Sequence, residues 1–72
     1  MHMSMTKLKS ERLKRGWSQQ VLGFHSQVAA SDVSRIENGR LVPYPSQAER
    51  IARILGIPKE DLQKPDEASR GE

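Results

Sequence analysis

Cysteine is absent from this sequence, and there is no cluster of cysteine and histidine residues. Neither disulfides nor a structural zinc ion can therefore stabilise the fold, and we expect no metal or other cofactor. The 72 residues form at most one domain, which buries only about 60% of the surface exposed by the unfolded chain. Close helix packing, with or without help from dimerisation, must then supply the stability.

Long apolar runs and strand-forming patterns are also scarce. No stretch approaches the length of a membrane span and no signal peptide is visible, so we expect no membrane association. These absences, with the missing cysteines, fit a cytoplasmic protein. Phenylalanine, tyrosine and tryptophan occur once each, β-branched residues are few, and apolar and polar residues do not alternate cleanly. The chain is therefore expected to be all-α.

Charge, by contrast, is plentiful and unevenly distributed. Residues 1–56 contain nine lysines and arginines against four acids, a net charge of +5. Residues 57–72 contain three against five, a net charge of −2. A basic body favours a polyanionic partner, although many small domains are equally basic.

Caps, glycine stops and apolar spacing predict five short helices. They span approximately residues 6–14, 19–25, 30–38, 45–55 and 58–63. Ser18 is expected to cap the second helix. The fourth helix begins either with a capping box at Ser46 or with Pro45 in its first turn.

These helices are expected to form one compact folded unit over residues 6–63. Residues 1–5 are expected to be a disordered N-terminus or a cloning remnant. Residues 64–72 are polar and are expected to form a flexible tail.

The third predicted helix carries an acid on its apolar side. Val33 and Ile36 share a face with Glu37, and Ala29 before the helix falls on the same side. An unpartnered buried carboxylate is costly. Either Glu37 is exposed and the helical interpretation fails, or a cation reaches it.

Arg12 is the candidate partner. It lies four residues after Leu8 in the first predicted helix, so it points inward if Leu8 does. A guanidinium can bind a carboxylate through two hydrogen bonds, and such a pair tolerates partial burial. The alternative is that Arg12 and Glu37 are both exposed surface charges.

The opposite side of the third helix is a polar stripe of short side chains with one arginine. Ser31, Ser34, Arg35 and Asn38 recur at helical spacing and offer hydrogen-bonding groups without bulk, as a surface that fits base edges requires. By itself the stripe could be an ordinary solvated face. However, residues 19–38 form a helix, a break of about three residues and a second helix, which is the arrangement of a helix-turn-helix.

Three blocks of sequence resemble the Cro/phage-repressor class, also called XRE-like. They are RLKRGWSQ at 12–19, SRIENGR at 34–40 and RIARILGI at 50–57. The three blocks occur in the same order and at the same spacing as in the family. Together they cover about residues 6–62. The resemblance implies a compact five-helix, lambda-repressor-like domain that binds double-stranded operator DNA, usually as a homodimer. It also implies an ion pair between Arg12 and Glu37, which agrees with the position of both residues on the apolar sides of their predicted helices.

The same resemblance implies roles for individual residues. Gln19 matches a glutamine that commonly touches a phosphate. Base-reading positions are matched by Ala30, Ser31, Ser34 and Arg35, and backbone-contacting positions by Asn38 and Arg40. The complete set of expected DNA-binding residues is Ser18, Gln19, Ala30, Ser31, Asp32, Ser34, Arg35, Asn38, Arg40 and Tyr44.

The sequence departs from the family's pattern at four places. Gln27 replaces the usual glycine between the two helices, and would have to adopt a positive φ. Ala29 replaces a Ser or Thr cap, so the start of the third helix could shift by a residue. Ala30 can offer only an apolar contact, for example to a thymine methyl. Asp32 could accept from cytosine N4, or it could simply repel phosphate.

Other chemically distinctive residues are given structural roles. Trp17 is expected in the core. His25 is expected at the surface, because no nucleophile or acid accompanies it. Tyr44 could donate to a phosphate from the start of the fourth helix, or it could pack under the loop. No catalytic constellation is present, so we expect no enzymatic activity.

The leading hypothesis is a sequence-specific DNA-binding transcriptional regulator that reads an operator in the major groove with the helix around 30–38. A phage-type repressor, a restriction–modification controller and an antitoxin would look alike. The alternative is a protein-interaction adaptor that uses the same fold. The polar stripe argues against a purely protein-binding surface, because it offers no aromatic or aliphatic anchor.

Overall fold

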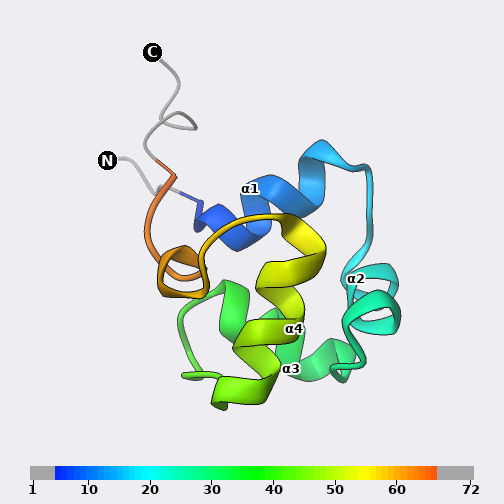
Figure 1. Ribbon diagram of the computed structural model, residues 1–72. Helices are drawn as coiled ribbons and strands as arrows, with labels where there is room; N and C mark the ends of the chain where they lie inside the picture. Colours follow the sequence, from blue (N-terminus) through cyan, green and yellow to red (C-terminus); the bar gives the residue numbers. More distant parts are fainter. Residues whose placement is uncertain (1–4, 67–72) are drawn as a thin grey trace.

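The computed structural model describes residues 5–66, and they form a small helical domain (Figure 1). Four α-helices follow one another: α1 (Lys7–Lys14), α2 (Gln19–Ser26), α3 (Ala30–Glu37) and α4 (Pro45–Leu55). A single 3-10 turn, η1 (Lys59–Asp61), follows them. Within residues 5–66 there is no strand, only an isolated bridge between Thr6 and Pro65. The expected all-α fold is confirmed.

The expected count of five helices is not confirmed, because the fifth segment forms a 3-10 helix and not an α-helix. In place of a helix over 58–63 there is a three-residue 3-10 turn, closed by hydrogen bonds from Asp61 N to Pro58 O (2.9 Å) and from Leu62 N to Lys59 O (3.3 Å). The segment has too few residues to propagate an α-helix after a proline. Leu62 turns inward instead and is 1% exposed.

Local capping chemistry fixes where the other helices begin. Thr6 Oγ1 accepts from Lys9 N, and Ser18 Oγ accepts from Val21 N as expected. Pro45 occupies the first turn of α4. Tyr44 precedes it, and the backbone N–H of Tyr44 donates to Gln47 Oε1 (3.0 Å). The α4 helix therefore uses Pro45 rather than a capping box at Ser46.

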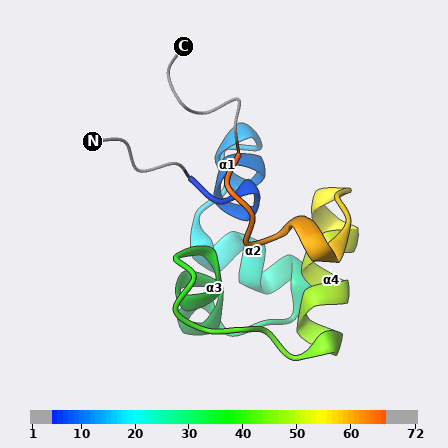
Figure 2. The same cartoon turned by 90° about the vertical axis from the view of Figure 1, so that its left-hand side faces the viewer.

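One apolar core joins all four helices and the 3-10 turn. Figure 2 shows α2 between α3 and α4, and α2 contacts both. The side chains of the core are Leu8, Leu22, Val28, Val33, Ile36, Ala48, Ile51, Ala52, Leu55 and Leu62. Trp17 is half-buried against this cluster, so its expected core position is confirmed only in part.

The two ends of the described chain are tied together. Lys7 N donates to Lys64 O (2.8 Å), and Asp66 N donates to Met5 O (2.7 Å). Residues 64–66, expected to start a flexible tail, are therefore held against the start of α1. The remainder of both predicted terminal segments, residues 1–4 and 67–72, lies outside the described residues. No helix within residues 5–66 has the length and apolar character needed to cross a membrane.

Candidate nucleic-acid interface

The α3 helix has a buried side and an exposed side, as its sequence predicts. Val33 and Ile36 are fully buried and Glu37 is 2% exposed. Ala29, which was expected on the buried side, is exposed, and Val28 is buried instead. The prediction failed there because Ala29 lies outside the helix, with φ −56° and ψ 140°, so helical spacing does not apply to it.

A buried ion pair joins α3 to α1, which confirms the prediction for Arg12 and Glu37. Arg12 Nε donates to Glu37 Oε1 (2.9 Å) and Nη2 donates to Oε2 (2.8 Å). The two side chains are only 8% and 1% exposed. Arg12 Nη1 also donates to the backbone oxygen of Trp17 (2.7 Å), so the three nitrogens of the buried guanidinium are all hydrogen-bonded.

The C-terminal end of α3 is held by contacts that the sequence did not reveal. Thr6 Oγ1 donates to the backbone oxygen of Glu37 (2.8 Å). Gln63 Nε2 donates to the backbone oxygens of Ile36 (3.0 Å) and Leu41 (2.7 Å). Thr6 thereby satisfies a carbonyl at the helix end, and Gln63 joins Ile36, whose oxygen also accepts from Gly39 N, to Leu41 in the following loop. The two donors come from the two ends of the domain, so no local pattern predicts them.

The turn between α2 and α3 adopts the conformation expected of it. Gln27 is left-handed, with φ 59° and ψ 41°, at the position where the family has glycine. Arg50 of α4 supports the turn, because its Nε donates to Ser26 O (2.8 Å) and its Nη2 to Gln27 O (3.2 Å). Sequence reasoning missed this role of Arg50.

Gly23 in the middle of α2 is a second residue that was missed. A Cβ atom at this position would lie 2.5 Å from the backbone oxygen of Val28, well inside van der Waals contact. Gly23 therefore permits the close approach of α2 to the turn. A glycine inside a helix, a few residues before a break, was the available signal.

The start of α3 is not shifted. The helix begins at Ala30 as expected, although Ala29 supplies no side-chain hydrogen bond as a cap. Asp32 lies in the first turn, where a negative charge is favourable to the helix dipole. The predicted base-reading residues therefore keep the register that the sequence assigns to them.

The outer side of α3 places the predicted polar stripe together on one surface. Ser31, Arg35 and Asn38 are exposed and Ser34 is half-buried. Asn38 ends the helix, and its Nδ2 donates to Ser34 O (2.9 Å). Arg40 is exposed beyond the helix end.

Asp32 and Arg35 form a second ion pair, on this outer side. Arg35 Nη1 lies 3.6 Å from Asp32 Oδ1, and the side chains are 61% and 30% exposed. The other carboxylate oxygen of Asp32 accepts from Gln47 Nε2 of α4 (3.3 Å). The acid that was expected either to accept from cytosine N4 or to repel phosphate thus already has two partners within the chain.

The remaining predicted contact residues flank α3. Ser18 is exposed and Gln19 is half-buried at the start of α2. Tyr44 is 75% exposed at the start of α4, so its side chain does not pack under the loop. His25 is exposed as expected, and its ring stacks on Trp17 with centroids 4.6 Å apart.

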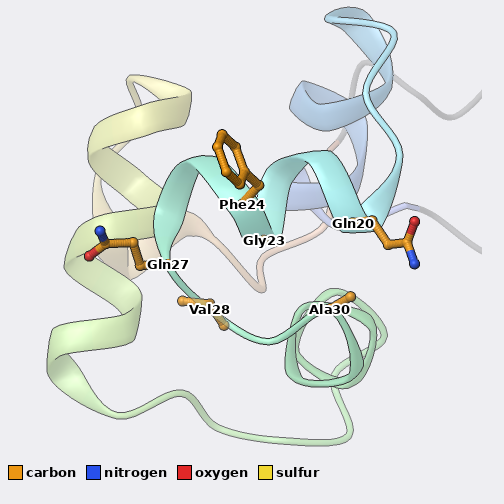
Figure 3. A pocket seen from close by; sticks show the side chains of 6 residues that line it. All are labelled: Gln20, Gly23, Phe24, Gln27, Val28 and Ala30. Atoms are coloured by element: carbon orange, nitrogen blue, oxygen red, sulfur yellow. The ribbon is translucent and has the colours of Figure 1, made fainter.

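A shallow groove runs along α2 beside the start of α3. Figure 3 shows its lining residues, with the ring of Phe24 pointing away from α3. The lining consists of Gln20, Gly23, Phe24, Gln27, Val28 and Ala30. Phe24 is 80% exposed, a position that no pattern in the sequence predicts. Among residues 5–66, no group of His, Asp and Glu side chains is arranged to hold a metal ion.

Comparison with known families agrees with this geometry. A family model described as a helix-turn-helix domain matches residues 6–64, which is most of the chain and includes α1 through η1. No curated protein matches the sequence.

Proposed function

The chain belongs to this helix-turn-helix family, and from that premise we propose that it is a sequence-specific DNA-binding regulator of transcription. It would act in the cytoplasm as a repressor or controller protein. The observation that carries the proposal is the two-sided construction of α3. Its inner side is fixed by the Arg12–Glu37 pair, while its outer side presents short polar groups and one arginine.

The exposed side of α3 suits a major groove. Ser31 and Ser34 can each donate and accept hydrogen bonds without filling the groove, and Ala30 can contact a thymine methyl. Arg35 has the fork that matches guanine O6 and N7. Asp32 is proposed to act through Arg35 rather than on a base.

The surrounding residues suit the phosphate backbone. Ser18 and Gln19 lie at the start of α2 and Tyr44 lies at the start of α4, where helix N-termini favour negative charge. Asn38 and Arg40 lie at and beyond the end of α3. These contacts would position α3 without carrying sequence information.

We further propose that the protein binds DNA as a homodimer, because one helix-turn-helix reads too few bases for useful specificity. Half-sites would lie about 34–36 Å apart, one turn of the duplex. We propose that the two chains meet through the segment Pro58–Leu62, without Leu62 itself, because Leu62 is buried in its own chain. A complex of one chain with one non-palindromic site, measured by light scattering, would contradict the dimer.

The chain is also proposed not to be an enzyme. On the outer side of α3 the polar contacts join Asp32 to Arg35 and Gln47, and Asn38 to the backbone of Ser34, and none of them pairs a nucleophile with a base. A broad screen of hydrolase and transferase substrates checks this, and any turnover that follows the purified protein would contradict it.

The decisive experiment selects bound sites from random duplex DNA and then compares two arginines. Arg35→Ala should cost about 1–3 kcal/mol on the selected site and relax the preference at one base pair. Arg40→Ala should weaken binding to all sequences alike. It should also reduce, by about one unit, the slope of the logarithm of the binding constant against the logarithm of the salt concentration. If Arg35→Ala lowers the affinity for selected and scrambled duplexes equally, Arg35 contacts only phosphate.

The alternative function is an antitoxin or protein-interaction adaptor that uses the same fold. The observation that favours it is Phe24, an aromatic anchor that is 80% exposed beside an apolar groove. Phe24→Gln separates the two functions. A DNA-binding regulator should keep the selected site and its affinity, whereas an adaptor that binds a protein through this groove should lose that partner.

A further inference from the structure

We propose that Gln47 and Asp32 form a positioning relay that holds the guanidinium of Arg35 in place on the outer side of α3. The inference rests on the proposed DNA-reading function and deepens it. It assigns a part in base selection to Gln47, a residue of α4 that lies outside the helix-turn-helix itself.

The relay is a continuous series of three contacts between α4 and α3. The backbone N–H of Tyr44 donates to Gln47 Oε1 (3.0 Å). Gln47 Nε2 donates to Asp32 Oδ2 (3.3 Å). Asp32 Oδ1 lies 3.6 Å from Arg35 Nη1.

The first contact determines the direction of the second. Because Gln47 Oε1 accepts from a backbone N–H, the amide can only present its Nε2 group, a donor, to Asp32. The anchor is backbone at the start of α4, and α4 is held to the core by Ile51 and Leu55. The position of the Asp32 carboxylate is therefore set from the rigid part of the domain.

The last contact leaves Arg35 able to read a base. It involves one terminal nitrogen, Nη1, so the fork made by Nε and Nη2 remains for two hydrogen bonds to guanine. At 3.6 Å the pair is longer than a strong charged hydrogen bond, so the guanidinium can still adjust its position when it meets a base. An arginine that is already confined loses less side-chain freedom when it binds.

The carboxylate also disfavours nonspecific contacts. Asp32 lies on the side of α3 that would meet DNA, where a negative charge repels phosphates. A complex in which Arg35 only neutralises a phosphate separates Arg35 from Asp32 and brings that phosphate close to the acid. The relay should therefore increase the ratio of specific to nonspecific binding rather than the overall affinity.

Gln47→Glu is the first test. The new carboxylate can still accept from Tyr44 N, so the start of α4 is retained, but it cannot donate to Asp32 and repels it. Negative charge near a helix N-terminus does not reduce stability. The preference at the base pair read by Arg35 should fall about two- to fivefold, the usual range for an exposed ion pair, and the melting temperature should change little because the favourable helix dipole offsets the repulsion from Asp32.

Asp32→Asn is the second test, and it changes the overall affinity in the opposite direction. Its amide oxygen can still accept from Gln47, but the charge that holds Arg35 is lost. The base preference should fall by the same factor, while binding to all duplexes strengthens because a negative charge has been removed. In the double variant the preference should fall no further than in either single variant, because both substitutions break the same relay.

Ser46→Glu is the matched control. It adds the same charge as Gln47→Glu at an exposed neighbouring position that takes no part in the relay. It should slightly weaken binding to all duplexes and leave the base preference unchanged. Arg35→Ala identifies the base pair to be compared.

The outcomes separate the relay from the proposed function. If Arg35→Ala abolishes a base preference that Gln47→Glu and Asp32→Asn both retain, DNA reading stands and the relay is wrong. If Arg35→Ala abolishes no preference, the relay has nothing to position and is also wrong. If the wild-type protein selects no sequence, the proposed function fails, and the relay is judged on the free protein. NMR relaxation of Arg35 Nε–H should then show greater side-chain mobility in both variants, and unchanged mobility would overturn the relay.

Discussion

The two sides of α3 each carry an arginine–carboxylate pair, and the two pairs differ in almost every physical respect. The inner pair, Arg12 and Glu37, is bidentate at 2.9 and 2.8 Å and at most 8% exposed. The outer pair, Arg35 and Asp32, has a single contact at 3.6 Å and its arginine is 61% exposed. The inner pair joins two helices, whereas the outer pair lies within one.

Burial accounts for the difference in role. Removing one partner of a buried pair leaves a charge without water or counter-charge, so the fold depends on both residues being present. An exposed pair is solvated and contributes little to stability, so its arginine remains free to form further hydrogen bonds with a ligand. The same two functional groups thus hold the helix on one side and remain available for recognition on the other.

The largest expected effect comes from breaking the inner pair. Glu37→Ala should lower the free energy of unfolding by about 3–5 kcal/mol, because it leaves Arg12 buried without its carboxylate. Urea unfolding followed by circular dichroism measures the loss. The double variant Arg12→Met, Glu37→Leu should lose much less. Small, additive losses in the two single variants would show that the pair does not couple the helices.

Gly23→Ala tests whether packing fixes the inner geometry as firmly as charge does. The added methyl must move the backbone oxygen of Val28, which a Cβ would approach to 2.5 Å. We expect a loss of about 1–3 kcal/mol in the free energy of unfolding. Alanine is otherwise the better helix former by about 1 kcal/mol. A net gain in thermal stability would therefore mean that α2 and the turn can separate at no cost.

Gln27→Gly should have a smaller and opposite effect. A left-handed backbone costs a non-glycine residue about 1–2 kcal/mol, of which the greater flexibility of glycine in the unfolded chain offsets a part. The variant should be more stable by about 0.5–1 kcal/mol in chemical denaturation. Lower stability would show that the side chain of Gln27 contributes contacts worth more than the backbone strain.

Arg35→Ala should have the smallest effect on stability, within about 0.5 kcal/mol of the wild-type protein. The same variant is expected to lose DNA affinity, so it separates the residues that stabilise the fold from those that recognise DNA most clearly. Differential scanning fluorimetry alongside binding to the selected duplex provides both values. A fall in unfolding free energy comparable with that of Glu37→Ala would remove the distinction between the two sides of α3.

Much of the fold was predictable because its determinants are local. The 3.6-residue period placed Val33 and Ile36 inside, and the residue types before the helices indicated where most of them begin. The positive φ of Gln27 and the pairing of Arg12 with Glu37 were also predicted correctly. The fifth helix was not, because a short segment after a proline becomes a helix or a single turn according to what it packs against, and here Leu62 packs into the core.

The candidate site was predictable only in its outline. Periodicity groups Ser31, Ser34 and Arg35 on one surface, but it gives no information about contacts from other helices. The contacts of Arg50 with the α2–α3 turn, and of Gln47 with Asp32, connect residues more than a dozen positions apart. Nothing in the local sequence around either partner indicates such a contact.

Sequence pattern alone was enough to place the four α-helices, to identify the apolar side of α3 and to show that Glu37 needs a cation. Each of these follows from interactions within a few residues or from the cost of burying a charge. The contact of Asp32 with α4, the exposure of Phe24 and the burial of Leu62 in the core depend instead on how the helices pack. These outcomes depend on which distant segments are brought together, since a polar side chain can bind only the groups that packing places within hydrogen-bonding distance.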